Sequence, residues 1–272
     1  MYSGTTFRTK SGRVMGVHQK IDRVARKHLT QHLPDGVFFP SVQDILHFEG
    51  LNGPDGVKRK SPAKDEPWHY VDPANPDDRA LLGMIHDHIH NLAEALKQNN
   101  NERAAFEAAW MAHAITDGLT PAHHYPLEAK LEQLRDGKGL ETRISAKDKI
   151  VLPGKNKREQ LKNNWEFWGA KGVMTTHFGF ELGVMTTIAP AGLAAGALTD
   201  FNVARIKKEG FETLFLEALH DISQMKMYEE FSRLGWTRHL ADETQKVLMP
   251  RIIQLVGCGW YQSVLMARGE AS

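Results

Sequence analysis

The feature that most constrains the fold of this chain is helical periodicity with little sign of strands. Between residues 17 and 33, apolar side chains such as Val17, Ile21 and Leu29 recur at the spacing of one helix face. The same pattern predicts helices over four further stretches: 77–98, 102–118, 200–234 and 237–268. Strand-like alternation is sparse, so the sequence predicts an all-α fold, a single-domain helical bundle with long loops that spans residues 1–272.

Three segments depart from this pattern. Residues 50–78 are dense in Gly and Pro, which predicts a loop without regular structure, and Trp68, His69 and Tyr70 argue against disorder there. A loop of this length in a compact protein usually serves function. The second segment begins with a predicted helix at 124–136 and continues as a charged excursion to 157. The third, 189–198, is small and apolar, which predicts a tightly packed connection or, as the alternative, a mobile flap beside an apolar substrate.

Composition excludes several classes of protein. Lys and Arg number 34 against 33 Asp and Glu, so the net charge of +1 gives no global argument for nucleic acid. The single cysteine, Cys258, allows neither an internal disulfide framework nor a thiolate cage for a metal. The sequence contains no apolar run of ~18 residues, so it predicts no transmembrane segment. Because no secretory signal is visible, the sequence as it stands predicts a cytoplasmic protein, or a secreted one if the chain lacks its signal.

Histidine is frequent, with 14 copies, and several of these residues are spaced with carboxylates. His113 precedes Asp117 by four residues and His177 precedes Glu181 by four, so each pair shares one helix face. One such pair alone is commonly a surface ion pair. Two pairs that face each other across a bundle supply four ligands on rigid elements. Imidazole with carboxylate suits Zn²⁺, and also Mn²⁺ or Fe²⁺.

Four further residues extend this candidate metal site. His123 follows Pro121, which is expected to end the preceding helix. Asp55 and His69 lie in the Gly- and Pro-rich loop, and His18 lies in the first predicted helix. The sequence therefore predicts a multinuclear metal site built from several helices and one long loop.

This ordered set resembles the zinc-dependent phospholipase C / P1 nuclease superfamily. The resemblance rests on the segments WHYVDP (68–73), HAITDGLTPAH (113–123) and HFGFE (177–181), and it covers residues 15–185. It implies an all-α fold with a trinuclear zinc cluster. The helices expected after residue 200 match only as helices.

The resemblance also implies a role for each candidate residue. The implied ligands of the first zinc are Asp55, His69, His113 and Asp117, and those of the second are His123, His177 and Glu181. Asp117 would bridge the first zinc to a third, which His18 would also bind. Asp55 would orient or deprotonate the attacking water. Asp35 also follows a Pro and is the alternative to Asp55.

The N-terminal part departs from the family pattern. In the family, a Trp at the mature N-terminus completes the third zinc site, whereas here no Trp precedes Trp68. A new amine created by cleavage could take its place, as could Asp22, one turn after His18. Two zinc ions are therefore expected, and the third is left open.

The segment between His123 and His177 is the second departure. It is longer than in compact bacterial phospholipases, so residues 124–176 are interpreted as an insertion. Trp165 and Trp168 within it are expected to pack in a core, the alternative being a platform on which nucleic-acid bases stack.

The function implied by the resemblance is hydrolysis of phosphoesters, with phosphodiesters favoured, by water activated at the metal. No Ser or Cys nucleophile motif is visible. The substrate is expected to be a phospholipid headgroup or a single-stranded nucleic acid or nucleotide, and no protein partner is obvious. Two alternatives stay open. One is a scaffold or metal-binding protein that has this fold without catalysis, and the other is an HD-type phosphohydrolase based on His86 and Asp87.

Overall fold

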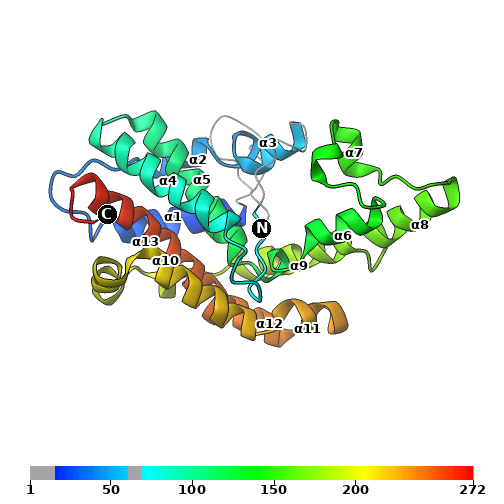
Figure 1. Ribbon diagram of the computed structural model, residues 1–272. Helices are drawn as coiled ribbons and strands as arrows, with labels where there is room; N and C mark the ends of the chain where they lie inside the picture. The colour runs from blue at the N-terminus through cyan, green and yellow to red at the C-terminus, as the bar shows by residue number, and fades with distance from the viewer. Residues whose placement is uncertain (1–15, 61–68, 272) are drawn as a thin grey trace.

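Helices alone form the regular structure of residues 16–60 and 69–271, the part of the chain that the computed structural model describes (Figure 1). The α-helices are α1 (Val17–Leu29), α2 (Val42–His47), α3 (Pro54–Lys60), α4 (Ala80–Lys97), α5 (Asn101–Gly118), α6 (Leu127–Leu134), α7 (Ala146–Ile150), α8 (Lys157–Trp168), α9 (Val173–Ile188), α10 (Asp200–Gln224), α11 (Met227–Leu234), α12 (Arg238–Glu243) and α13 (Met249–Ala267). The all-α prediction is confirmed. Trp68 and the N-terminal residues 1–15 lie outside the described part.

Two segments that the sequence assigned to loops contain helix. The loop prediction for 50–78 is wrong at its start, where the turn Gly50–Asn52 leads directly into α3. Pro54 opens α3, a position at which a missing N–H costs nothing, and Asp55 lies in the first turn, where the helix dipole favours a carboxylate. The charged excursion likewise contains α7, which begins after Ser145. There, Asp148 accepts hydrogen bonds from the Ser145 backbone N–H at 2.8 Å and from its hydroxyl at 2.7 Å.

The two long helices predicted near the C-terminus are interrupted. The first divides into α10 and α11 at Lys226, which has a φ of +53°, and Gly210 kinks α10 with a φ of +77°. The second divides into α12 and α13, joined by a π-helical turn at Thr244–Leu248. Amphipathic spacing runs through these breaks, so periodicity alone did not reveal them.

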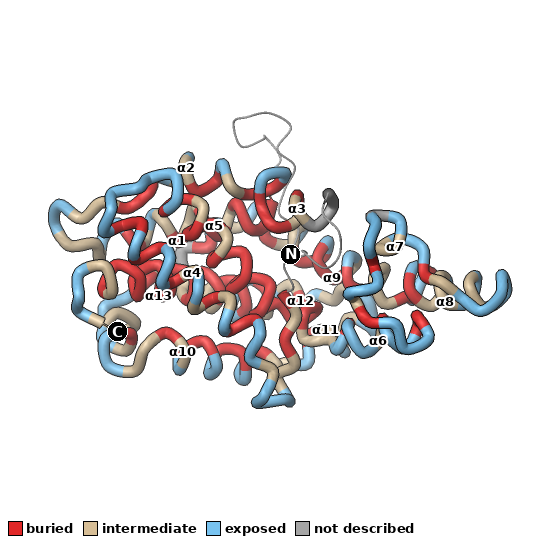
Figure 2. The backbone as a smooth tube through the Cα atoms, turned by 45° about the horizontal axis from the view of Figure 1, so that its top comes forward, coloured by how far each residue is buried: buried red, intermediate tan, exposed pale blue. Residues whose placement is uncertain are grey.

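The core of the bundle is centred on α13, which packs against α1, α4, α5 and α10. Figure 2 shows that buried residues concentrate in these helices. Trp260 is fully buried and donates its indole N–H to the carbonyl oxygen of Ala108 on α5 at 2.9 Å. A Cβ on Gly259 would lie 2.9 Å from the Met111 Sδ, so glycine there lets α13 approach α5 closely. The position of α5, which carries two candidate ligands, thus depends on α13.

The single cysteine belongs to this core. Cys258 is fully buried in α13, and burial raises the pKa of its thiol to about 12. A thiol in this environment is a packing residue and not a metal ligand or nucleophile.

Helices α6, α7 and α8 form an arm that projects from the bundle (Figure 1). This arm, residues 127–168, has a small core of its own, made of Leu127, Leu131, Leu134, Leu152 and Phe167. The prediction that Trp165 packs inside is wrong, because its side chain is 73% exposed. Trp168 is 37% exposed and stacks on Phe178 of α9, with ring centroids 6.4 Å apart.

The connection at 189–198 packs against the bundle in its second half, as predicted, whereas Ala189, Pro190 and Gly192 are exposed. Leu193 and Leu198 are buried, and a Cβ on Gly196 would lie 2.7 Å from the Cβ of Ile253 in α13. Among the described helices, none combines the length and the apolar character that crossing a membrane requires.

Replacing Trp260 with Ala should remove a fully buried ring together with its hydrogen bond to α5. We expect the free energy of unfolding, measured by urea denaturation, to fall by about 3–5 kcal/mol. Trp165→Ala is the matched control, and because that ring is largely exposed its effect should stay within about 0.5 kcal/mol. Equal losses in the two variants would contradict the central position of α13.

Candidate metal centre

The centre begins at the C-terminal end of α5. His113 and Asp117 lie one turn apart on its buried face, with His113 Nε2 3.2 Å from Asp117 Oδ2. The helix ends at Gly118, and Pro121 opens a tight turn in which the backbone N–H of His123 donates to Thr120 O at 2.8 Å. This turn brings His123 back, with its Nε2 3.6 Å from Asp117 Oδ1. The role that the sequence suggested for Pro121 is therefore visible in the backbone.

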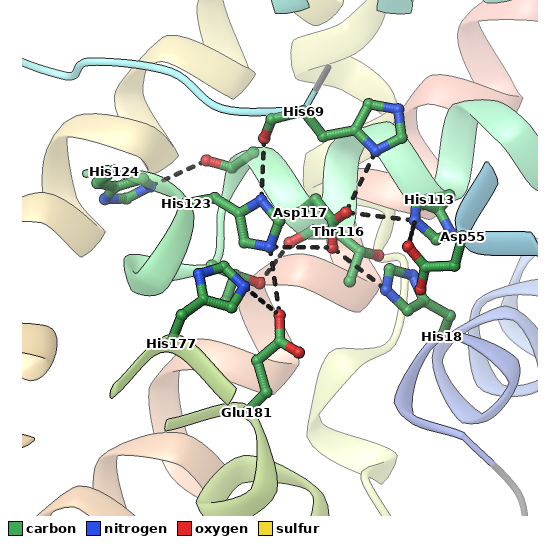
Figure 3. A network of polar contacts seen from close by, with 12 residues as sticks. His18, Asp55, His69, His113, Thr116, Asp117, His123, His124, His177 and Glu181 are labelled. Carbon is green, nitrogen blue, oxygen red and sulfur yellow. Dashed lines mark hydrogen bonds and ion pairs between the residues drawn. The ribbon is translucent and has the colours of Figure 1, made fainter. Parts of the chain in front are cut away.

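Two histidines from distant parts of the chain also contact Asp117 (Figure 3). His18 of α1 places Nε2 3.2 Å from Asp117 Oδ1, and its ring stacks on that of His113 at a centroid distance of 3.9 Å. His69 places Nδ1 3.2 Å from Asp117 Oδ2. Four imidazoles therefore surround one buried carboxylate. We call His18, His113 and Asp117 the first ligand group, because one ligand atom of each lies within 4.8 Å of the others.

A second ligand group consists of His123, His177 and Glu181, whose ligand atoms also lie within 4.8 Å of one another. His177 and Glu181 share one face of α9, where Glu181 Oε1 lies 2.9 Å from His177 Nε2 and 3.3 Å from His123 Nε2. His123 thus contacts carboxylates of both groups. All three side chains are buried.

The loop after the undescribed residues fixes the orientation of His123. Its Nδ1 donates to the His69 carbonyl oxygen at 3.2 Å, and its own carbonyl accepts from the Val71 backbone N–H at 3.1 Å. Tyr70 stacks on the ring, with centroids 4.7 Å apart. Because Nδ1 is occupied, the Nε2 lone pair of His123 points at Asp117 and Glu181, the arrangement seen for histidines that bind metals.

Asp55 lies at the edge of the centre. Its Oδ1 is 3.8 Å from His113 Nε2, and its side chain is 34% exposed, the largest value among the eight candidate residues. Asp35, the alternative, is exposed in the turn that follows α1. The described structure therefore brings all eight candidates to one region and leaves Asp35 outside it.

The separations match ligands of a common cation. Two ligand atoms that each lie about 2.0–2.1 Å from a tetrahedral Zn²⁺ are about 3.3 Å apart. The contacts of Asp117 with His18, His69 and His113 measure 3.2 Å each, which is longer than a usual charge-assisted hydrogen bond. Within the described residues, the buried His113 Nε2 has no hydrogen bond of acceptable geometry. The donor set, buried and free of thiolate, therefore fits a borderline divalent cation such as Zn²⁺.

The protonation states also suit cation binding. Burial alone would raise the pKa of Asp117, but the imidazoles of His123, His113 and His18 hold it well below its ordinary value. The pKa of Glu181 is likewise held well below its ordinary value by His177 and His123, against the effect of burial. Burial lowers the pKa of His123 to about 4, so its lone pair is available at neutral pH.

His113 behaves differently from the other histidines. Burial alone would lower its pKa, but the negative charges of Asp117 and Glu49 raise it to about 10. His113 therefore has to release a proton when it binds a cation.

Sequence reasoning missed Glu49. This fully buried carboxylate follows α2 and places Oε2 3.5 Å from His113 Nδ1, on the side of the ring away from Asp117. Asp22, which the sequence suggested as a possible ligand, is buried near Glu49 and belongs to neither ligand group of the described residues. Glu49 follows the end of a short helix, so no periodic pattern marked it.

His86 and Asp87 do not join the centre. His86 Nε2 instead contacts Glu212 on α10 at 3.2 Å, and Asp87 is exposed. The structure gives no support to a phosphohydrolase site built on this pair.

Comparison with known proteins bears on the fold. No protein-family model matches the chain, and no curated protein matches its sequence. Among solved structures, it is similar to the alpha-toxin of Clostridium perfringens from avian strain SWCP, with a TM-score of 0.58 and 14% sequence identity. This likeness shows a shared fold.

The similarity covers 94% of this chain and 65% of the toxin chain, so the chain spans less than two thirds of the toxin's length. It supports the all-α architecture of this chain. At this level of identity, it does not extend to activity, substrate or individual ligands.

Replacing Glu49 with Gln should weaken metal binding without removing a ligand. The neutral amide is a weaker acceptor for the His113 Nδ1–H, so it orients the ring less firmly and leaves Nε2 a poorer donor to the cation. Such partners typically contribute 10- to 100-fold in metal affinity, so we expect a loss of about that size. Competition with a chromophoric zinc chelator would measure it. Glu94→Gln, which changes an exposed glutamate on α4, should leave the affinity unchanged. Unaltered affinity in the Glu49 variant would show that the contact has no role.

Proposed function

We propose that this protein is a metal-dependent hydrolase of phosphoesters, with phosphodiesters as the favoured class. The observation that supports this most strongly is the link between the two ligand groups. His123 lies 3.6 Å from Asp117 of the first group and 3.3 Å from Glu181 of its own group. Cations held by two such adjoining groups would lie close together, as in enzymes that hydrolyse phosphoesters with paired metals.

The proposed assignment follows the resemblance. Asp55, His69, His113 and Asp117 would hold one Zn²⁺, and His123, His177 and Glu181 would hold a second. His18 lies as close to Asp117 as His69 does, which supports the proposal that Asp117 would share its carboxylate with a further cation.

Bound divalent cations supply Lewis acidity toward a phosphoester oxygen and lower the pKa of a coordinated water. The chain contributes a rigid, buried set of ligands on α1, α5 and α9, which fixes where a phosphate oxygen can lie. Asp55 is the carboxylate that combines proximity to His113 with access to solvent. We assign it the orientation of the attacking water and acceptance of its proton.

A metal-binding protein without catalysis is the second candidate. The deep burial of Asp117 and its four histidines favours it, because a closed site holds a cation without admitting a substrate. The partial exposure of Asp55 favours the hydrolase. The two candidate functions differ in one measurable property.

That property is hydrolysis of bis(p-nitrophenyl) phosphate by the zinc-loaded protein. We expect turnover that a chelator abolishes and added Zn²⁺ restores. Asp55→Asn should lower the rate about 10²- to 10⁴-fold, because an amide cannot accept the proton. Asp72→Asn, in the turn after the loop, is the matched control, since Asp72 accepts a hydrogen bond from the backbone of Ala74 at 2.9 Å. Tight zinc binding without any hydrolysis across pH would establish the non-catalytic alternative.

A further inference from the structure

The arm and α9 together display an apolar stripe that the metal centre does not use. Leu161, Trp165 and Trp168 follow one another at intervals of four and three residues, so they share one face of α8. Leu161 and Trp165 are each 73% exposed. On α9, Phe178 and Leu182 are four residues apart, and both are more than half exposed.

These two faces form one surface. Trp168 stacks on Phe178 with ring centroids 6.4 Å apart, which joins the stripe of α8 to that of α9. We call this α8–α9 stripe the arm surface and define it by Leu161, Trp165, Trp168, Phe178 and Leu182. Exposed apolar side chains are common singly, but a continuous helical stripe with two exposed tryptophans marks a surface for a partner.

The charge beside this surface identifies the kind of partner. Residues 137–171 carry nine Lys and Arg against four Asp and Glu, a net charge of +5 in a chain whose total is +1. Lys157 and Arg158 precede Leu161 by four and three residues, so both cations lie on the stripe face of α8, and both are exposed. Lys162 and Lys171 are also exposed beside it.

The acidic residues of α8 are engaged elsewhere. Glu166 forms an ion pair with Lys130 of α6, and Glu159 accepts a hydrogen bond from the Lys155 backbone N–H at 2.8 Å. The face that carries the tryptophans therefore presents cations and apolar groups together. Such a face is complementary to a partner surface whose outer layer is negatively charged and whose layer below is apolar.

We propose that the arm surface binds an anionic lipid bilayer. Trp165 and Trp168 would occupy the headgroup region with Leu161, while Lys157 and Arg158 would contact lipid phosphates and carboxylates. Trp165 suits this boundary because it combines a large exposed ring with a polar N–H. Trp168 donates its own N–H to the Ile150 carbonyl oxygen at 2.7 Å and contributes its ring alone. The aliphatic Leu161 and Leu182 within the stripe favour lipid over single-stranded nucleic acid, whose bases stack on aromatic rings.

The surface adjoins the metal centre. The ring of Phe178 lies 5.8 Å from that of His177, its neighbour in α9 and a member of the second ligand group. A bilayer bound here would present its headgroups beside that group. This last consequence rests on the proposed function, whereas the binding itself needs no metal.

Vesicle flotation of the full chain, with a chelator present, tests the binding alone. We expect binding to vesicles of phosphatidylcholine and phosphatidylserine in equal parts, and much weaker binding to phosphatidylcholine alone. Lys157→Ala with Arg158→Ala should lower the partition coefficient by roughly 30-fold, since each cation near an anionic surface contributes about 1 kcal/mol. The adjacent exposed pair on α10 gives the matched control, Lys207→Ala with Lys208→Ala, which should bind like the unchanged protein.

The apolar part has its own variant. Leu161→Ala with Trp165→Ala should lower the partition coefficient by about tenfold or more, because both side chains leave water on binding. Phe201→Ala, which alters a side chain 70% exposed on α10, should have no effect. Circular dichroism melts would verify that every variant is folded.

Three outcomes would overturn the proposal: no binding to the mixed vesicles, equal binding by the arm variants and their controls, or displacement from vesicles by single-stranded oligothymidylate. The last would assign the surface to nucleic acid. Hydrolysis of bis(p-nitrophenyl) phosphate, a soluble substrate, should be unchanged in Leu161→Ala with Trp165→Ala. If the unchanged protein and every variant bound vesicles as expected but none hydrolysed bis(p-nitrophenyl) phosphate, the proposed function would be contradicted and the proposed lipid binding would stand.

Discussion

The organisation of this protein depends on one buried carboxylate, that of Asp117. A charge removed from water is costly unless it is compensated, and here four imidazoles lie within 3.6 Å of its oxygens. These imidazoles come from α1, the loop before α4, α5 itself and the turn after α5. The segments that carry these histidines therefore meet at this carboxylate. A divalent cation would complete this arrangement, because it neutralises Asp117 and satisfies the ring nitrogens at once.

The rest of the fold fixes the positions of α5 and α9, the two helices that carry four of the candidate ligands of that centre. On one side, α13 presses a glycine and Trp260 against α5, which fixes the helix that carries His113 and Asp117. On the other side, the two faces of α9 have different roles. Its buried face supplies His177 and Glu181, and its exposed face continues the apolar stripe of the arm. One helix thus links the proposed chemistry to the proposed membrane contact.

Much of the centre could be predicted because its geometry is local. Residues four apart share a helix face, and a proline reverses the chain, so the convergence of His113, Asp117 and His123 follows from spacing. Glu49 could not be found in this way, since its contact with His113 joins residues 64 positions apart and depends on tertiary packing. Helix α3 was missed because Pro54 indicates a loop as readily as a helix start. The exposure of Trp165 was missed because an apolar stripe looks the same whether it faces a core or a partner.

The most direct test of the account is a crystal structure of the zinc-loaded protein with anomalous scattering measured across the zinc absorption edge. The account predicts two adjacent peaks. One should lie about 2.0–2.2 Å from ligand atoms of His113 and Asp117, and the other at the same distance from those of His123 and Glu181. An absence of anomalous signal at Asp117, or zinc bound only elsewhere on the molecule, would contradict the claim that this carboxylate organises a metal centre.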